Sequence, residues 1–198
     1  ASVAGRPFNP GDPPNPRDAY ARSKANAERE LATICKGTSL APIVLRLPLV
    51  YGPGVKGNFL ALLDEVARAR PLPLRAIRNH RSILFVGNLI DAIDAALDAP
   101  SPPTGVHFIT DRESVSVPAL VTAVGKALGT PVRLKAVPVR LLKFAGQVTG
   151  RGALIDRLVG TLEADSTSFT DATGWRPRHS LAEGLDVTAR WWRLRHSI

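Results

Sequence analysis

The chain has no methionine, a single cysteine and no long apolar run. Cys35 alone can form neither an internal disulfide nor a cysteine-based zinc site, so we assign no metal ligand and expect a reducing, cytoplasmic environment. Every apolar run falls short of the roughly 18 residues that a membrane-spanning helix needs, and no secretory signal is visible. These absences exclude a disulfide scaffold and predict a protein without a membrane span.

A natural reading frame starts with methionine, yet this sequence begins with Ala1. The chain is therefore processed or is a piece of a longer protein, and we favour the second explanation. Its 198 residues suffice for one core, or for one domain plus part of another. Hydrophobic residues at 44% and charged residues at 22% are typical of a globular protein.

Aromatic residues are few, and basic residues outnumber acidic ones to give a net charge of +9. Such a balance raises the question of nucleic-acid binding. The basic residues are scattered along the chain, and the two tyrosines and six phenylalanines form no RNA-binding pattern. A polyanionic small ligand or a solvated basic surface explains the charge equally well. We expect no nucleic-acid partner.

The first part of the chain predicts a loop, a helix and a strand. Residues 1–15 are rich in proline and glycine and are typical of a loop. A helix is expected to start with Asn15 as its N-cap and Pro16 at its first position, and to end near Lys36. The apolar segment 41–50 predicts one near-continuous strand of a buried parallel sheet.

Helix and strand patterns then alternate to the end of the chain. Ser116 is expected to cap one helix, and Ser180 with Glu183 forms a capping box at the start of the last one. This alternation predicts an α/β fold. The predicted helices cover 58–69, 88–97, 117–128, 138–148 and 152–162, and the predicted strands cover 81–86, 105–110 and 131–137.

The segment "LRLPLVYGPGVKGNFLALL" contains a G-x-G-x-x-G pattern at Gly52, Gly54 and Gly57. A dinucleotide-binding turn also needs an acidic residue about 20 positions further on. The sequence there is "IRNHR", without a carboxylate, and Pro53 removes a backbone donor from the turn. We interpret the glycines as a hinge through which the chain leaves a sheet and starts a second lobe.

The segment "DAYARSKANAERELATICK" places Tyr20 and Lys24 four residues apart, on one face of the predicted helix. The same stripe runs through Ala27, Leu31 and Ile34, and we expect it to face the core. A lysine there needs a polar partner, such as the Tyr20 hydroxyl or a ligand resting against both. An ammonium near a phenol stabilises the phenolate, which makes the pair a candidate general base. A surface tyrosine beside a snorkelling lysine is the alternative.

Four ordered segments resemble the extended short-chain dehydrogenase/reductase family, in its nucleotide-sugar epimerase/dehydratase branch. They are "PFNPGDPPNPRDAYARSKANAE", "VLRLPLVYGPGVKGNF", "RSILFVGNLIDAIDAAL" and "DATGWRPRHSLAEGL". The resemblance is strongest to the UDP-glucose 4-epimerase-like and UDP-N-acetylquinovosamine dehydrogenase-like group. It implies the C-terminal part of a Rossmann-like, doubly wound parallel sheet and a smaller α/β substrate-binding lobe.

The resemblance also implies how the chain is divided. Residues 1–50, joined by about 85–112, would be the remnant of an NAD(P)-binding Rossmann domain, and 51–84 with 113–198 would form the substrate-binding lobe. The family's first strand and its glycine-rich turn are absent from this sequence, so we expect the chain alone to bind NAD weakly or not at all and to be inactive. The serine or threonine that completes the catalytic set is expected upstream of Ala1, and Ser2 is not expected to be that residue.

The resemblance assigns roles to individual residues near the cofactor. Tyr20 would be the general acid/base, and Lys24 would hold the nicotinamide ribose while polarising Tyr20. The backbone at Leu47 and Pro48 would pass close to the nicotinamide. The expected cofactor is NAD, with NADP left open.

Two further residues would contact the substrate. Asn58 would meet the nucleotide part, although it is also a plausible helix cap. Arg81 would pair with the diphosphate, a task that suits a planar and permanently charged group. Its alternative is a surface charge on an edge strand.

The resemblance implies an NAD(P)-dependent epimerase or dehydrogenase that acts at C4 of a UDP-sugar. Tyr20 would take a hydroxyl proton while the cofactor takes a hydride. Two other functions stay open: a non-catalytic binding or regulatory module of the same fold, and a small-carbonyl NADPH reductase. The choice between epimerase, dehydrogenase and dehydratase stays open as well. The Tyr20 helix is a possible homodimer contact.

Overall fold

The computed structural model describes residues 5–16 and 18–196. Over these residues helices and parallel strands alternate, which confirms the predicted α/β class. The strands are β1 (Ile43–Arg46), β2 (Leu49–Tyr51), β3 (Ile83–Phe85) and β4 (Gly105–Phe108). The helices are α1 (Ala19–Cys35), α2 (Gly57–Ala67), α3 (Val86–Asp98), α4 (Val117–Leu128), α5 (Val139–Val148), α6 (Gly152–Val159), α7 (Thr167–Thr173) and α8 (Leu181–His196).

The strands form two parallel pairs, β1 with β4 and β2 with β3. The prediction of one strand over 41–50 is therefore wrong, because the chain leaves the first pair after Arg46 and enters the second at Leu49. Pro48 lies between them and has no N–H group with which to continue a ladder. The G-x-G-x-x-G segment then makes the turn that leads from β2 out of its sheet into α2.

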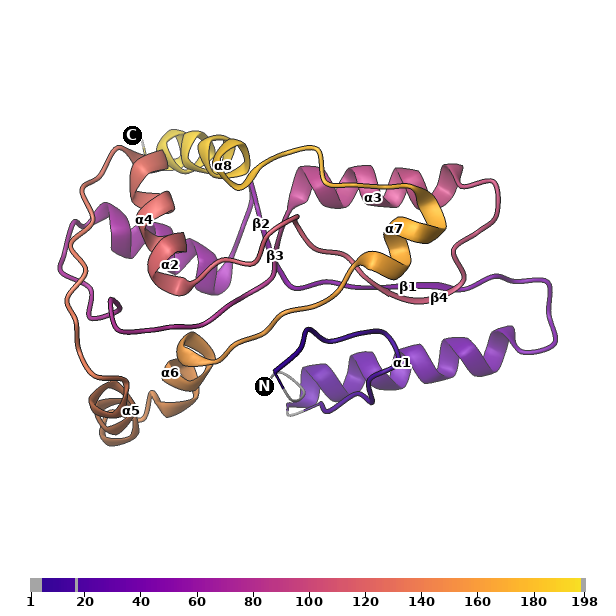
Figure 1. The fold of residues 1–198 in the computed structure, drawn as a ribbon, viewed down its shortest axis with the longest axis horizontal. Helices are drawn as coiled ribbons and strands as arrows, with labels where there is room; N and C mark the ends of the chain where they lie inside the picture. The colour runs from indigo at the N-terminus through magenta and orange to yellow at the C-terminus, as the bar shows by residue number, and fades with distance from the viewer. Residues whose placement is uncertain (1–4, 17, 197–198) are drawn as a thin grey trace.

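The helices are distributed around these two pairs (Figure 1). Helix α1 lies on one side of the β1–β4 pair and α3 lies on the other. Helices α2, α4 and α8 gather beside the β2–β3 pair, while α5 and α6 pack against each other at a corner of the molecule. In the part of the chain that the structure describes, none of these helices has both the length and the apolar character that crossing a bilayer requires.

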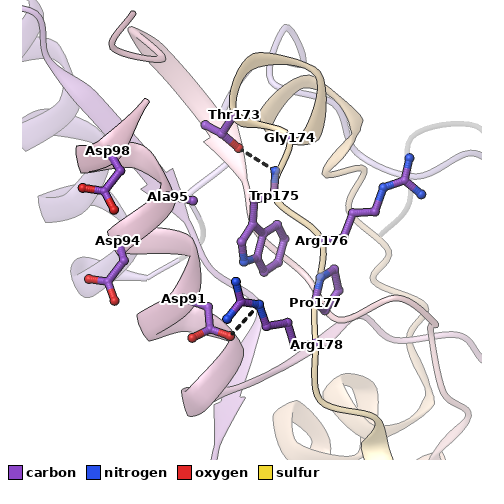
Figure 2. Close-up of a pocket in the computed structure, with 10 residues that line it drawn as sticks. All are labelled: Asp91, Asp94, Ala95, Asp98, Thr173, Gly174, Trp175, Arg176, Pro177 and Arg178. Carbon is purple, nitrogen blue, oxygen red and sulfur yellow. Dashed lines mark hydrogen bonds and ion pairs between the residues drawn. The ribbon is translucent and has the colours of Figure 1, made fainter. Parts of the chain in front are cut away.

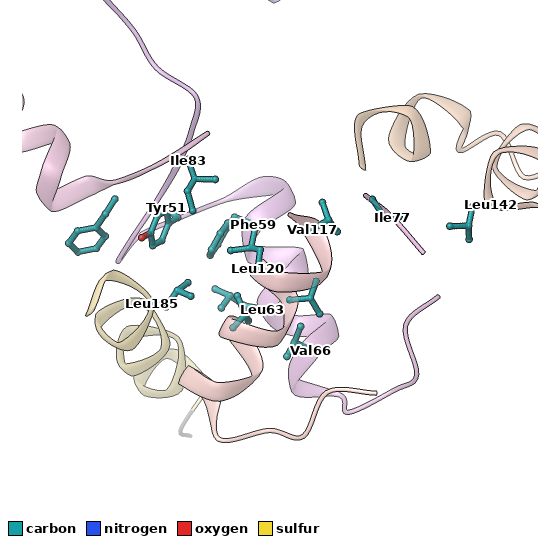
Figure 3. Close-up of a cluster of buried hydrophobic side chains, with 13 residues drawn as sticks. Tyr51, Phe59, Leu63, Val66, Ile77, Ile83, Val117, Leu120, Leu142 and Leu185 are labelled. Carbon is teal, nitrogen blue, oxygen red and sulfur yellow. The ribbon is translucent and has the colours of Figure 1, made fainter. Parts of the chain in front are cut away.

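The larger hydrophobic core lies between β2–β3 and helices α2, α4 and α8 (Figure 3). Phe59, Leu63 and Val66 recur at helical spacing, so α2 presents one apolar face to this core. A second cluster lies against β4 and α3. It consists of Leu84, Ala92, Ala96, Ile109, Phe169 and Trp175.

Two helix starts agree with the sequence prediction. Ser116 caps α4 and accepts a hydrogen bond from the N–H of Ala119 at 3.2 Å. At the start of α8, the N–H of Ser180 donates to the Glu183 carboxylate at 2.7 Å, and the N–H of Glu183 donates back to the Ser180 hydroxyl at 3.3 Å. The capping box is therefore confirmed.

Two local predictions are wrong, and one short helix was missed. Helix α1 begins after Asp18, whose carboxylate accepts from the N–H of Ala21 at 2.8 Å, so Asn15 is not its cap. The segment 131–137 forms no strand, because its partner is an irregular segment that it meets in an isolated bridge between Leu72 and Leu134. Helix α7 was not predicted, since it is only 7 residues long.

Gly184 of α8 packs so closely against the β2–β3 pair that a larger side chain does not fit. Replacing it tests how tightly α8 packs in this core. A Cβ atom at this position would lie 2.7 Å from the Tyr51 hydroxyl oxygen and 2.9 Å from the Phe85 ring. We expect Gly184→Ala to lower the free energy of unfolding by about 1–3 kcal/mol through overpacking, as measured by chemical denaturation.

Gly152 of α6 provides the matched control. It is also helical, but the nearest atom to its added Cβ would lie 3.8 Å away. Gly152→Ala should be neutral, or stabilising by up to about 1 kcal/mol. Equal losses in the two variants would contradict this account of the α8 interface.

Candidate functional site

Tyr20 and Lys24 lie together in the first turns of α1. The Lys24 ammonium lies over the Tyr20 ring, with Nζ 5.8 Å from the ring centroid. Asp18 caps the helix immediately before them. The structure therefore places the phenol and the ammonium on one face, as their spacing predicts.

This face is turned outward, and the prediction that it faces the core is wrong. Tyr20 is 73% exposed and Ile34 is 67% exposed. The partly buried face of α1 instead carries Ala21, Ala25 and Glu28. Each of these residues comes one position after a residue of the predicted stripe. One residue corresponds to a rotation of about 100° around the helix axis, so the inward face is turned by that angle from the predicted one.

An ion pair anchors that inward face to the sheet. Glu28 of α1 pairs with Arg46 at the end of β1, with 2.6 Å between Oε2 and Nη2. Both side chains are largely shielded from solvent. Tyr20, Leu31 and Ile34 remain exposed on the outward side of the helix.

Leu47 and Pro48 follow the carboxyl end of β1, between the two strand pairs. Leu47 is exposed and Pro48 is partly buried. In open α/β sheets, ligands bind beyond the carboxyl ends of the strands. Leu47 and Pro48 therefore lie where a ligand of such a sheet would bind. That their backbone passes close to a nicotinamide stays a prediction. Ser2 lies outside the described residues.

Asn58 is the second residue of α2 and is exposed. The N-cap position belongs to Lys56, whose side chain makes no capping hydrogen bond, so the interpretation of Asn58 as a helix cap is wrong. In the described part of the chain the Asn58 amide makes no hydrogen bond and remains available to a ligand.

Arg81 is half-buried and holds the end of α6. Its Nη1 donates to the carbonyl oxygens of Arg157 and, at 3.2 Å, of Gly160. These carbonyls lie at the C-terminal end of α6, where a cation is favourable. Burial lowers the pKa of the guanidinium from its ordinary value. The interpretation of Arg81 as a surface charge on an edge strand is therefore wrong.

Removing the Arg81 guanidinium should loosen α6. We expect Arg81→Gln to lower the free energy of unfolding by about 1–2 kcal/mol, because two carbonyl groups lose a charged donor. Arg81→Lys, which keeps the charge but not the fork, should lose less. Chemical denaturation of both variants checks this, and equal stability of Arg81→Gln and the parent would contradict it.

Sequence reasoning missed a buried cluster that we call the polar junction, which consists of Tyr51, Asn88 and Asp111. The Asp111 carboxylate accepts from the backbone N–H of Phe85 at 3.0 Å, from the Asn88 amide at 2.8 Å and from the Tyr51 hydroxyl at 3.3 Å. All three junction residues are buried. The sequence offered one signal, since Asn88 stands at the start of the predicted helix 88–97 and Asp111 directly follows the predicted strand 105–110.

The polar junction also fixes the segment before α8. The Asn88 side-chain oxygen accepts from the backbone N–H groups of Arg178 and His179, at 3.1 and 2.9 Å, and its amide nitrogen donates to the His179 carbonyl at 2.9 Å. The junction thus joins β2, β3, α3, β4 and residues 177–180. Burial raises the pKa of the Asp111 carboxyl, and burial and the nearby Asp111 charge raise the pKa of the Tyr51 phenol.

The raised pKa of Asp111 gives a pH dependence of definite sign. The folded state binds the proton more tightly than the unfolded chain, whose aspartate has a pKa of about 3.9. The free energy of unfolding should therefore fall as pH rises from there through the raised native pKa, and then level off. Asp111→Asn cannot titrate and should lack this contribution.

Urea denaturation of both proteins at a series of pH values above 4 isolates the effect of Asp111. The stability of the parent relative to Asp111→Asn should decrease as pH rises. A difference that increases with pH would show that the donors around Asp111 outweigh its burial.

Two cavities lie near the polar junction, and neither is lined by a predicted site residue. One is beside the junction and is lined by Asp111, Ser114 and His179, among others. The other lies between α3 and residues 173–178 (Figure 2). Tyr20 and Lys24 lie on α1, Leu47 and Pro48 follow β1, Asn58 lies on α2 and Arg81 precedes β3. Among the described residues, no group of His, Cys, Asp or Glu is arranged to hold a metal ion.

Residues 2–108 of this chain match the NAD dependent epimerase/dehydratase family. The UDP-glucose 4-epimerase of Vibrio cholerae is 35% identical over 190 residues, which cover 96% of this chain and 58% of the relative. The chain thus spans less than two thirds of that relative's length.

Solved structures share the fold. The UDP-glucuronic acid 4-epimerase from Bacillus cereus in complex with NAD matches with a TM-score of 0.74 and 17% identity, covering 94% of this chain and 56% of that one. The UDP-glucose 4-epimerase from Thermotoga maritima with UDP-glucose matches with a TM-score of 0.73 and 20% identity, covering 99% and 60%. At these identities the likeness concerns the fold alone.

Proposed function

Because this chain belongs to the NAD dependent epimerase/dehydratase family, we propose that it carries the acid/base and substrate-binding part of an enzyme acting at C4 of a UDP-sugar. The observation that carries the proposal is the Tyr20–Lys24 contact on an exposed face at the start of α1. The 35% identity to a protein named UDP-glucose 4-epimerase supports the choice of C4 and of a UDP-sugar.

The residues around Tyr20 fit a nicotinamide cofactor. Lys24 presents an ammonium with three N–H donors, which suits the hydroxyls of a ribose. Leu47 and Pro48 offer an apolar wall at the carboxyl end of β1, which suits one face of the nicotinamide. NAD, when bound, supplies the hydride acceptor for the oxidation at C4. Lys24 would hold it, and Leu47 with Pro48 would flank it.

Tyr20 would act on the proton. Its hydroxyl oxygen, as phenolate, would accept the proton of the sugar hydroxyl at the carbon that is oxidised, and would return that proton when the ketone is reduced. The Lys24 ammonium would stabilise the phenolate form through its positive charge. Epimerisation also requires that the ketosugar turn within the site and receive the hydride on its other face.

Asn58 and Arg81 would bind the other end of the substrate. The free amide of Asn58 at the start of α2 can accept and donate hydrogen bonds to a nucleotide. Both side-chain hydrogen bonds of Arg81 to described residues use Nη1, which leaves Nη2 for a diphosphate oxygen. In this proposal Arg81 fixes α6 and binds the substrate at the same time.

We divide the chain accordingly. Residues 1–50 and 85–112 would belong to the cofactor-binding part, and 51–84 and 113–198 to the substrate-binding part. The pairing of β1 with β4 and the separate core around α2, α4 and α8 support this division. Phe169 and Trp175 of the substrate-binding part pack against α3 and β4 of the cofactor-binding part, so the two parts share a hydrophobic contact.

The protein translated from its complete gene provides the test. Tyr20→Phe should lower kcat for UDP-sugar epimerisation by at least about 100-fold, because general acid/base catalysis is lost. The binding of UDP-sugar and of NAD, measured by calorimetry, should be retained within a few-fold, since the ring and the Lys24 charge remain.

Tyr51→Phe is the matched control, because these are the only two tyrosines in the sequence. It removes the hydroxyl from the polar junction and should cost about 1 kcal/mol of stability while leaving kcat unchanged. Full activity of Tyr20→Phe would overturn the acid/base role and favour a binding module.

A further inference from the structure

Helices α5 and α6 form a hairpin at one corner of the molecule (Figure 1). They pack tightly against each other, since a Cβ atom on Gly146 would lie 2.7 Å from Cγ1 of Ile155. Leu142 is buried in the same contact region. The inward face of α5 is thus occupied, and its other faces are open to a partner.

The outward face of α5 is apolar. Leu141, Phe144 and Val148 are 60%, 65% and 72% exposed. Their spacing of three and four residues puts them in one stripe, on the side of the helix opposite Leu142 and Gly146. We call these three residues the α5 stripe. A row of large apolar side chains that faces solvent marks an interaction surface.

The surroundings of the α5 stripe are strongly basic. Residues 131–160 contain six basic residues and one acidic residue, a net charge of +5 out of +9 for the whole chain. Arg140 and Lys143 border the stripe along one side. The single acid, Asp156, pairs with Lys143 at 3.3 Å. The basic residues are spaced out in the sequence, and the asymmetry comes from the lack of acids among them.

We propose that the α5–α6 hairpin docks on the surface of an anionic phospholipid bilayer. The α5 stripe would enter the boundary between headgroups and acyl chains, and Arg140 and Lys143 would remain among the lipid phosphates. An apolar stripe bordered by cations is the pattern of helices that lie in a membrane interface. Anionic lipids attract such cations, and each one strengthens binding by about fivefold.

The charge selects this partner over two others. A second copy of the chain would bring an equally basic surface against this one, and like charges repel. A nucleic acid would meet the cations but would leave Leu141 and Val148 without a function, because those side chains cannot stack on bases. A bilayer with anionic headgroups satisfies both the apolar and the basic part of the surface.

Docking would also orient the molecule. Arg157 of α6 lies 3.5 Å from the carboxylate of Asp18, the residue that caps α1. Because the α5 stripe faces away from α6, the bound hairpin would hold α6 and the start of α1 on the side of α5 that is turned away from the bilayer. The docking itself does not depend on the proposed activity, because no residue of the α5 stripe belongs to the proposed site.

Vesicle flotation with the 198-residue chain tests the proposal. The chain should bind vesicles of phosphatidylcholine mixed with phosphatidylglycerol, bind far less to phosphatidylcholine alone, and dissociate as salt is raised. The double variant Leu141→Ser/Phe144→Ser should bind anionic vesicles at least about tenfold more weakly. The double variant Arg140→Gln/Lys143→Gln should lose about 25-fold.

Helix α3 supplies the matched control. Its exposed Ile90 and Leu97 form a similar apolar row, but Asp91, Asp94 and Asp98 on the same helix make its surroundings acidic. Ile90→Ser/Leu97→Ser should bind anionic vesicles as the parent does. Circular dichroism of all variants should be unchanged, since the replaced side chains are exposed.

Three results would overturn the proposal. The first is equal binding to neutral and anionic vesicles, and the second is a loss in the α3 variant as large as in the α5 variants. The third is the absence of binding to anionic vesicles; a dimer or a complex with duplex DNA that Leu141→Ser/Phe144→Ser abolishes would then assign the α5 stripe to that partner.

Discussion

The carboxylate of Asp111 is the group on which the arrangement of this chain depends. It lies three residues after the end of β4 and receives hydrogen bonds from β3, from α3 and from the tyrosine that ends β2. Asn88 extends the same network to the segment before α8. A buried acid stabilises a fold only when its donors are in place, so these five segments are held in one relative position.

That constraint links the two strand pairs, which share no backbone ladder. The β1–β4 pair holds α1 through Glu28 and Arg46, and the β2–β3 pair rests on the core of α2, α4 and α8. The chain crosses from one pair to the other at Pro48, and the gap is bridged by the polar junction and by a backbone hydrogen bond from the N–H of Asp111 to the carbonyl of Ile83 at 2.8 Å. A ligand that contacts both α1 and α2 would thus find them in a defined relation.

The exposed helix faces of this chain differ in the charges that surround their apolar side chains. The outward face of α1 carries Tyr20 and Lys24 beside apolar residues, as suits a ligand with polar and ring-shaped parts. The outward face of α5 carries apolar residues among cations and lacks acids. Helix α3 has an apolar row among aspartates. Similar apolar rows on α3 and α5 therefore lie in opposite electrostatic surroundings, acidic on α3 and basic on α5.

The sequence by itself determined the features that depend on neighbours along the chain. The Ser116 cap, the Ser180–Glu183 capping box and the contact between Tyr20 and Lys24 are set by residues three or four positions apart, and all were predictable. The family resemblance also followed from short ordered motifs. These elements form wherever the local pattern is present.

Only the tertiary structure decided which face of α1 turns inward, that the segment 41–50 divides between two sheets, and that Arg81 reaches the end of α6. Each outcome depends on groups far away in sequence: Arg46 for Glu28, β3 and β4 for the two strands, and the carbonyl of Gly160 for Arg81. The polar junction joins residues 51, 88 and 111 in the same way. The periodicity of apolar residues predicts that a helix or strand has an apolar face. Which segment covers that face is decided by packing and buried hydrogen bonds.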